Sequence, residues 1–137
     1  MIEFTVPGEP VAKARPRVTK SGLTFTPAKT VNYETLVKEM FAIECKNQYL
    51  EGEIKAEMDF YFTIPKSTSR KKRALMISGE IRPVKRPDTD NVIKSIADSL
   101  NGLAYNDDSQ IVEIVARKWY GEQPKAVIRL SEIKKGE

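Results

Sequence analysis

The 137-residue sequence contains no histidine, and this absence excludes several classes of catalytic site. Hydrolases of the Ser/His and Cys/His types need an imidazole base, and zinc sites of the histidine type need an imidazole nitrogen. Any hydrolysis by this chain would therefore depend on carboxylates, lysine, a metal ion and water.

Cysteine and long apolar runs are also scarce. The single cysteine, Cys45, allows no disulfide within the chain, and its helical surroundings predict a core position. No apolar run approaches the roughly 20 residues that span a membrane. The N-terminal MIEFTVPG lacks the charged and apolar regions of a signal peptide. We therefore expect a cytoplasmic protein without membrane association.

The length and charge are those of a small basic domain. Residues 1–137 are enough for one hydrophobic core, so we expect a single domain. The net charge of +4 and the isoelectric point near 9.1 weakly indicate an anionic partner.

Two periodicities in the sequence predict an α+β fold. Apolar and polar residues alternate as in half-buried strands, and helical spacing marks three other segments. We expect a single mixed sheet of about four strands with helices packed against it, the last two strands forming an antiparallel pair. The expected strands are 2–6, 54–64, 110–120 and 126–131, and the expected helices are 26–46 with Thr26 as N-cap, a short one from 67–69 to 76, and one after Asp88.

The segment 87–108, PDTDNVIKSIADSLNGLAYNDD, joins an amphipathic helix to two groups of acidic residues. A structural interpretation makes Asp88 the helix cap and pairs Asp90 with Lys94 one turn later. A functional interpretation starts from the repulsion between clustered carboxylates, which a cation between them relieves. Mg²⁺ binds one or two carboxylates together with water or phosphate oxygens. An EF-hand loop is excluded, because Val92 and Ile93 stand where it needs an acidic or amide residue and a glycine.

Cations are concentrated in three segments whose extended side chains could reach a DNA backbone. They lie in the loop 8–22, in the first turn of the short helix and just before Asp88. Cations are unfavourable in the first turn of a helix unless an anion lies nearby. Solvated surface explains each segment equally well, so phosphate contacts are one of two interpretations. The candidate DNA-binding residues are Lys13, Arg15, Arg17, Arg70, Lys85 and Arg86, with Asn91 supporting the site through hydrogen bonds.

The string RPDTDN at 86–91, Lys94 beyond it, the apolar helix and NDDSQIVE at 106–113 resemble the RusA family. These are Holliday junction resolvases, crossover junction endodeoxyribonucleases common in prophages. The resemblance implies a Mg²⁺-dependent homodimer that cuts branched DNA by paired nicks in DNA recombination and repair. It implies catalytic and metal-binding roles for Asp88, Asp90 and Asp108, and a functional role for Lys94. Some family members carry a basic residue directly before the first aspartate, where this chain has Pro87.

Three functions stay open on the sequence alone. They are a four-way junction resolvase, a nuclease of flaps or forks, and a non-catalytic nucleic-acid-binding protein whose acidic residues are caps and ion pairs. For an enzyme, we expect Asp108, just before a strand, to meet Asp88 and Asp90 at a site for one or two Mg²⁺ ions. Whether Asp107 shares the role of Asp108 is open.

Overall fold

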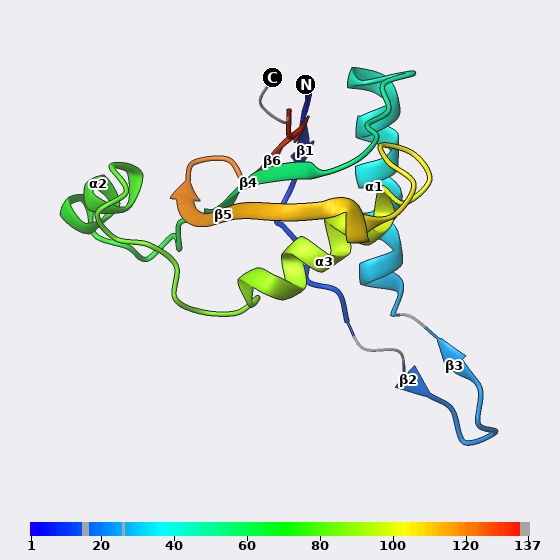
Figure 1. Cartoon of the computed structure of the whole chain (residues 1–137). Helices are drawn as coiled ribbons and strands as arrows, with labels where there is room; N and C mark the ends of the chain where they lie inside the picture. The colour runs from blue at the N-terminus through cyan, green and yellow to red at the C-terminus, as the bar shows by residue number, and fades with distance from the viewer. Residues whose placement is uncertain (15–16, 26, 135–137) are drawn as a thin grey trace.

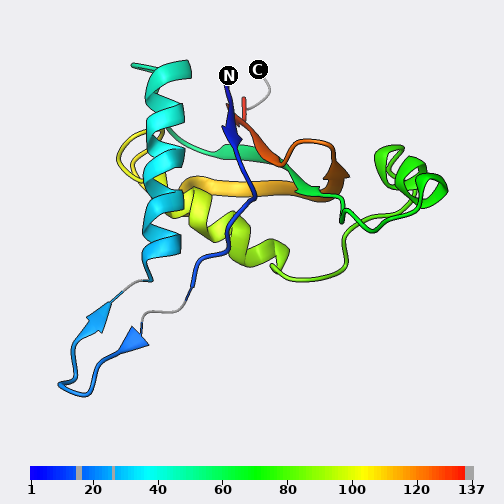
Figure 2. The same cartoon turned by 180° about the vertical axis from the view of Figure 1, so that it is seen from behind.

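The computed structural model describes residues 1–14, 17–25 and 27–134, and it contains one mixed sheet of four strands in the order β1-β6-β4-β5. β4 and β5 are parallel, and the other neighbours are antiparallel. The predicted α+β class and single mixed sheet are confirmed (Figures 1 and 2). The strands are β1 (Ile2–Pro7), β4 (Ile54–Thr63), β5 (Ile111–Gly121) and β6 (Lys125–Glu132), and the helices are α1 (Ala28–Glu44), α2 (Arg70–Ile77) and α3 (Thr89–Ser99).

β4 organises the hydrophobic core because its alternate residues are apolar along its whole length. Successive side chains of a strand point to opposite faces, so these residues share the face on which α1 and α3 pack. α3 packs its own apolar stripe against this same face of the sheet, as its helical period predicts. Buried residues of this core include Ile54, Ala56, Met58 and Phe60 from β4, Val37 and Phe41 from α1, and Val92, Ile96 and Leu100 from the α3 segment.

The other face of the sheet, called the outer face below, carries an ion-pair network around Asp59. The Asp59 residue is only 8% exposed, so its carboxylate needs hydrogen-bond partners within the protein. It accepts hydrogen bonds from Arg117 at 3.2 Å, Arg129 at 3.3 Å and the indole nitrogen of Trp119 at 2.8 Å. A buried carboxylate is tolerated when it is paired and hydrogen-bonded in this way. The network keeps polar the face of the sheet opposite to α1 and α3.

The predicted antiparallel pairing of the last two strands is wrong. β5 and β6 follow each other through a turn at 122–124, but β4 lies between them and pairs with both. Burial explains the arrangement, because β4 is apolar enough to occupy the centre of the sheet. β5 instead leaves Val112, Ile114 and Val115 more than a third exposed, which suits an edge. Alternation identifies strands but does not say which of them are neighbours.

The helix starts agree with the sequence in one case and differ in another. Ser69 caps α2 by accepting the N–H of Lys72 at 3.3 Å, within the start predicted at 67–69. α1 begins after Pro27, which occupies the N-cap position without a side-chain hydrogen bond, so the predicted cap is wrong and Thr26 itself lies outside the described residues.

The basic loop contains a small hairpin of β2 (Arg17–Val18) and β3 (Thr24–Phe25). Cys45 is buried, as predicted. No helix in the described ranges is long and apolar enough to cross a membrane.

Candidate active site

Asp88 and Asp90 lie at the start of α3 with their carboxylates turned to solvent. Asp88 occupies the N-cap position, as predicted, but its side chain makes no capping hydrogen bond. Its main-chain oxygen accepts the N–H groups of Asn91 and Val92 at 3.2 Å. Asp90 is exposed, and the described residues contain no ion pair between it and Lys94. Of the structural interpretation, the N-cap position of Asp88 and the place of Asp90 in the first turn are observed, whereas the side-chain cap and the ion pair with Lys94 are not found among the described residues.

A groove of about 700 Å³ opens beside Asp88, between the starts of α1 and α3. Thr30 closes one wall by accepting the N–H of Ala14 at 3.3 Å and donating to the carbonyl of Ala12 at 3.4 Å. Asp88 and Asn91 line the groove from α3, Arg86 lines it from the connection before α3, and Lys29 lines it from α1. One carboxylate, that of Asp88, thus lines a groove whose walls also carry two cations, and Asp90 lies two residues further along α3.

Lys29 is a candidate site residue that we did not identify from the sequence. It lies in the first turn of α1, where the helix dipole disfavours a cation. That position was the available signal, because the same argument drew attention to the cations at the start of α2. The described residues give Lys29 no ion-pair partner.

Lys13 has a structural role in addition to the phosphate contact predicted for it, which stays a prediction. Its ammonium group donates to Glu34 at 2.9 Å and lies 3.7 Å from Asp98, which ties α1 to α3. The hydrogen bond to Glu34 raises the pKa of Lys13 above its usual value. Its main-chain N–H also donates to the carbonyl of Asn91 at 2.8 Å. The lysine thus anchors the N-terminal segment against α3 and is engaged by two acids.

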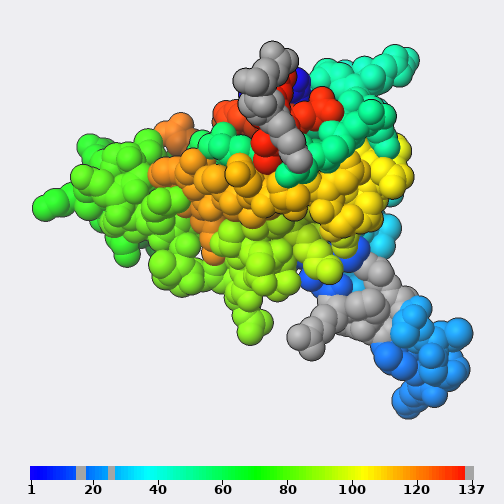
Figure 3. All heavy atoms as spheres, in the orientation of Figure 1, coloured from blue at the N-terminus to red at the C-terminus, as the bar shows by residue number. Residues whose placement is uncertain are grey.

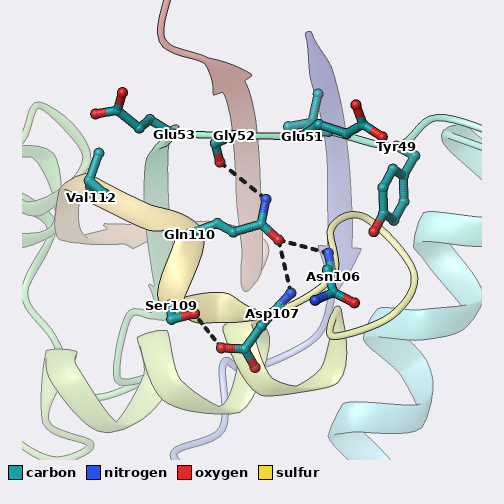
Figure 4. A pocket seen from close by; sticks show the side chains of 10 residues that line it. Tyr49, Glu51, Gly52, Glu53, Asn106, Asp107, Ser109, Gln110 and Val112 are labelled. Atoms are coloured by element: carbon teal, nitrogen blue, oxygen red, sulfur yellow. Dashed lines mark hydrogen bonds between the residues drawn. The ribbon is translucent and has the colours of Figure 1, made fainter.

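Asp107 and Asp108 have different environments, which separates their roles. Asp107 caps the short 3-10 helix Asp108–Gln110, because its carboxylate accepts the N–H of Ser109 at 3.0 Å. Hydrogen bonding from the Ser109 side chain, and then from its main-chain N–H, lowers the pKa of Asp107. Gln110 returns the contact by accepting the N–H of Asp107 at 3.0 Å, and it donates to the carbonyl of Gly52 at 3.1 Å (Figure 4). Asp107 therefore belongs to the local turn and borders a second hollow, which leaves Asp108 as the candidate acid.

The structure places Asp108 at the end of α3 opposite to Asp88 and Asp90. The N–H of Asp108 donates to the side-chain oxygen of Asn101 at 2.8 Å, and Asn101 lies just past the last turn of α3. An eleven-residue helix is about 16 Å long at 1.5 Å per residue. Within the described ranges, no group of three acidic or thiol side chains has a spacing that could hold a metal ion. The expectation that one chain would bring the three aspartates together is therefore not met.

Comparison with known proteins identifies the family. The family model described as endodeoxyribonuclease RusA matches residues 7–131. The chain belongs to the RusA family. A protein of Bacillus subtilis (strain 168), named uncharacterized protein YqaN, is 35% identical over 137 residues, covering 96% of each chain. The resemblance inferred from RPDTDN and NDDSQIVE is confirmed, and the family supports an endodeoxyribonuclease acting on DNA.

The remaining predicted site residues of this RusA family member lie in three places. Lys94 is exposed on the second turn of α3, on the same helix as Asp90. Lys85 and Arg86 are exposed in the connection that leads to Asp88, and Arg70 is exposed at the first position of α2. Arg15 lies outside the described residues, as does the side chain of Arg17. Arg86, Asp88 and Asn91 therefore line one groove, whereas Arg70 lies apart from it on α2, drawn in green in Figure 3.

Proposed function

We propose that this protein is a Mg²⁺-dependent endonuclease that resolves four-way DNA junctions by paired nicks as a homodimer, in recombination and repair. The observation that carries the proposal is the start of α3. Asp88 and Asp90 lie there without a capping hydrogen bond or ion pair among the described residues, and Asp88 lines a groove together with Lys29 and Arg86. Two exposed acids beside two cations suit a metal ion and a phosphate together.

The donor set fits Mg²⁺. Carboxylate oxygens are hard donors, and Mg²⁺ usually takes one or two of them and fills its other positions with water and substrate phosphate. Asp88 and Asp90 supply such a pair. When bound, Mg²⁺ would act as a Lewis acid on the scissile phosphate and would lower the pKa of an attacking water.

The other residues of the chain would act on the DNA itself. Arg86 and Lys29 would hold backbone phosphates on either side of the scissile one, because both line the groove that Asp88 borders. Lys94, one turn into α3, would meet the negative charge that grows in the transition state. Asn91 would keep the groove wall in place, since its carbonyl already accepts the N–H of Lys13.

The position of Asp108 supports a dimer in which each site uses two subunits. β5 begins just after Asp108, and Lys118 near its other end donates to the carbonyl of Pro87, next to Asp88. β5 and α3 therefore run alongside each other in opposite directions (Figure 1). A two-fold axis across the middle of β5 would bring the partner subunit's Asp108 to the Asp88 end of α3. The third acid would then come from the second copy.

The free edge of β5 supports the same pairing. β5 is an edge strand of eleven residues, and Val112, Ile114 and Val115 on it are 54%, 42% and 37% exposed. Long exposed edges with apolar side chains are uncommon in monomers, because they template pairing with another chain. Antiparallel pairing with a second β5 would cover these residues, and a two-fold dimer matches the near two-fold symmetry of a junction.

The proposed function is tested by incubating the protein with labelled four-way, flap and linear duplex DNA, with and without Mg²⁺. We expect paired nicks in the four-way junction only when Mg²⁺ is present. Faster cleavage of flaps would favour the flap or fork nuclease instead. Tight binding without cleavage of any of the three DNAs would favour a non-catalytic DNA-binding protein.

Lys94→Ala is expected to slow cleavage while leaving the fold and DNA binding nearly unchanged. The side chain is exposed and has no ion-pair partner among the described residues, so its loss should not affect melting. A charge that stabilises the transition state should cost at least about tenfold in rate, or about 1.4 kcal/mol. Melting, junction binding and single-turnover cleavage are measured on one preparation. Wild-type cleavage by this variant would assign Lys94 to the solvated helix surface.

Junction affinity is expected to fall steeply with salt, and the residues of the groove should contribute to that slope. Each phosphate contact releases counterions, so Lys29→Gln and Arg86→Gln should each reduce the slope of log K against log salt by about 1. Lys38→Gln, on the exposed side of α1, is the matched control and should leave the slope unchanged. Wild-type slopes for Lys29→Gln and Arg86→Gln would show that the groove does not contact DNA phosphates.

A further inference from the structure

Lys118 makes an unusual set of contacts near the proposed site. It faces the helix side of the sheet, because its register partner on β4 is the buried Phe60. Its ammonium group donates to the main-chain carbonyls of Lys85 at 2.7 Å and Pro87 at 3.0 Å, and it lies 5.5 Å from the ring of Phe62. In the described part of the chain it forms no ion pair with a carboxylate. The lysine is thus committed to the main chain of the connection between α2 and α3.

The same connection is held from the outer face of the sheet by Arg82. The guanidinium of Arg82 lies 3.9 Å above the centre of the Trp119 ring, and its Nε donates to the carbonyl of Lys118 at 2.8 Å. Gly79 also lies against the Trp119 ring. A Cβ at this position would lie 3.0 Å from the ring, and the φ of +87° also favours glycine. The connection therefore contacts the end of β5 from both faces of the sheet. Arg82 contacts the outer face, and Lys85 to Pro87 contact the helix side.

The contact at Pro87 bears directly on Asp88. The carbonyl of Pro87 and the amide nitrogen and Cα of Asp88 belong to one planar peptide unit. Fixing that carbonyl fixes the plane from which the Asp88 side chain departs. The contact at Lys85 fixes the main chain beside the two cations Lys85 and Arg86. Both contacts are to a segment without helix or strand, so no ladder of hydrogen bonds would otherwise hold it.

We propose that Lys118 is a positioning residue of the nuclease site, which orients Asp88, Lys85 and Arg86 by holding the main chain of residues 85–87 against β5. The inference rests on the proposed function, because it assigns a purpose to that orientation. Lys118 does not touch the scissile phosphate in this role. It acts through the carboxylate that binds the metal and through the cations that bind the DNA backbone.

The test compares Lys118→Met, which keeps the length of the side chain without its charge, with Lys118→Arg, which keeps the donors. Lys125→Met is the matched control, because Lys125 also lies over an aromatic ring, Tyr61 at 5.1 Å, but on the outer face of the sheet. Three quantities are measured for each: the ¹³C shifts of the Lys85 and Pro87 carbonyls, metal-free junction binding, and single-turnover cleavage as a function of Mg²⁺ concentration.

For Lys118→Met we expect altered carbonyl shifts at both residues, a higher Mg²⁺ requirement, and cleavage slowed by on the order of 10- to 100-fold through misplacement of Asp88. Metal-free binding should change by no more than about threefold, since phosphate contacts of other cations remain. Lys118→Arg should recover much of the rate. Lys125→Met should match the wild type in all three measurements.

Two results would overturn the inference. One is a folded Lys118→Met protein that cleaves at the wild-type rate with the wild-type Mg²⁺ requirement; the other is unchanged carbonyl shifts at Lys85 and Pro87. If Lys118→Met does not fold, Lys118→Gln, which keeps one amide donor, takes its place with the same criteria. A wild-type protein that cleaves none of the DNAs would instead refute the proposed function, and the carbonyl shifts would still report whether Lys118 holds the segment.

Discussion

Asp88→Asn and Asp90→Asn are each expected to abolish DNA cleavage while leaving junction binding intact or tighter. Asparagine keeps the shape of the side chain but loses the charge that would hold Mg²⁺, and removing negative charge near phosphate favours DNA binding. The loss should be at least on the order of 100-fold, as for other groups that stabilise the transition state electrostatically. Single-turnover cleavage and binding by fluorescence anisotropy, on the same preparations, measure the two effects.

Stability separates this prediction from a structural role. The side chain of Asp88 makes no capping hydrogen bond, so Asp88→Ala should change the free energy of unfolding by less than the roughly 1 kcal/mol of a working cap. Asp107→Ala is the matched control, because the carboxylate of Asp107 does cap the 3-10 helix before β5. We expect Asp107→Ala to lose about 1 kcal/mol of stability and retain most of its cleavage rate. Wild-type cleavage by both Asp88→Asn and Asp90→Asn would refute the metal site.

Mixing two inactive variants is expected to restore cleavage if each site draws on both subunits. In a dimer of one Asp88→Asn and one Asp108→Asn chain, one site receives both substitutions and the other receives neither. Random exchange of subunits makes about half of the dimers mixed, so about a quarter of all sites should be intact. The intact site should nick one strand of a junction without the paired nick, which gel analysis of both labelled strands detects.

The control for this experiment is a mixture of Asp88→Asn with Asp90→Asn. Both residues lie at the same end of α3, so every site in a mixed dimer still carries one substitution. This mixture should stay inactive. If Asp88→Asn with Asp108→Asn stays inactive as well, although subunit exchange is demonstrated, the three acids belong to one chain and the two-fold pairing across β5 is wrong.

The sequence predicted those parts of the site that depend on local pattern. The amphipathic period of α3 placed Asp88 at its N-cap and Asp90 on its exposed face, and both positions are as expected. The spacing of RPDTDN and NDDSQIVE identified the family, which the match over residues 7–131 confirms. These features are set within a few turns of helix, where periodicity and capping preferences are strong signals.

The parts that were missed depend on contacts between distant segments. Lys13 was grouped with the other cations of its loop, but Glu34 and Asp98 reach it from two helices. Lys118 carried no signal in the sequence, because its partners are main-chain carbonyls of a connection that follows α2. The distance from Asp108 to Asp88 could not be foreseen either, since it depends on the direction in which β5 runs relative to α3.

The order of the strands has a consequence for the synthesis of this protein. β6 is the last strand made, yet it lies inside the sheet between β1 and β4, and Ile2 pairs with Leu130. Contacts between the two ends of a chain form late, because the whole intervening loop must be closed first. On the ribosome, β4, α3 and β5 can associate while β1 still has no neighbouring strand. A chain interrupted before Lys125 would keep every acidic residue of the proposed site but leave β1 unpaired and one edge of β4 open to other chains.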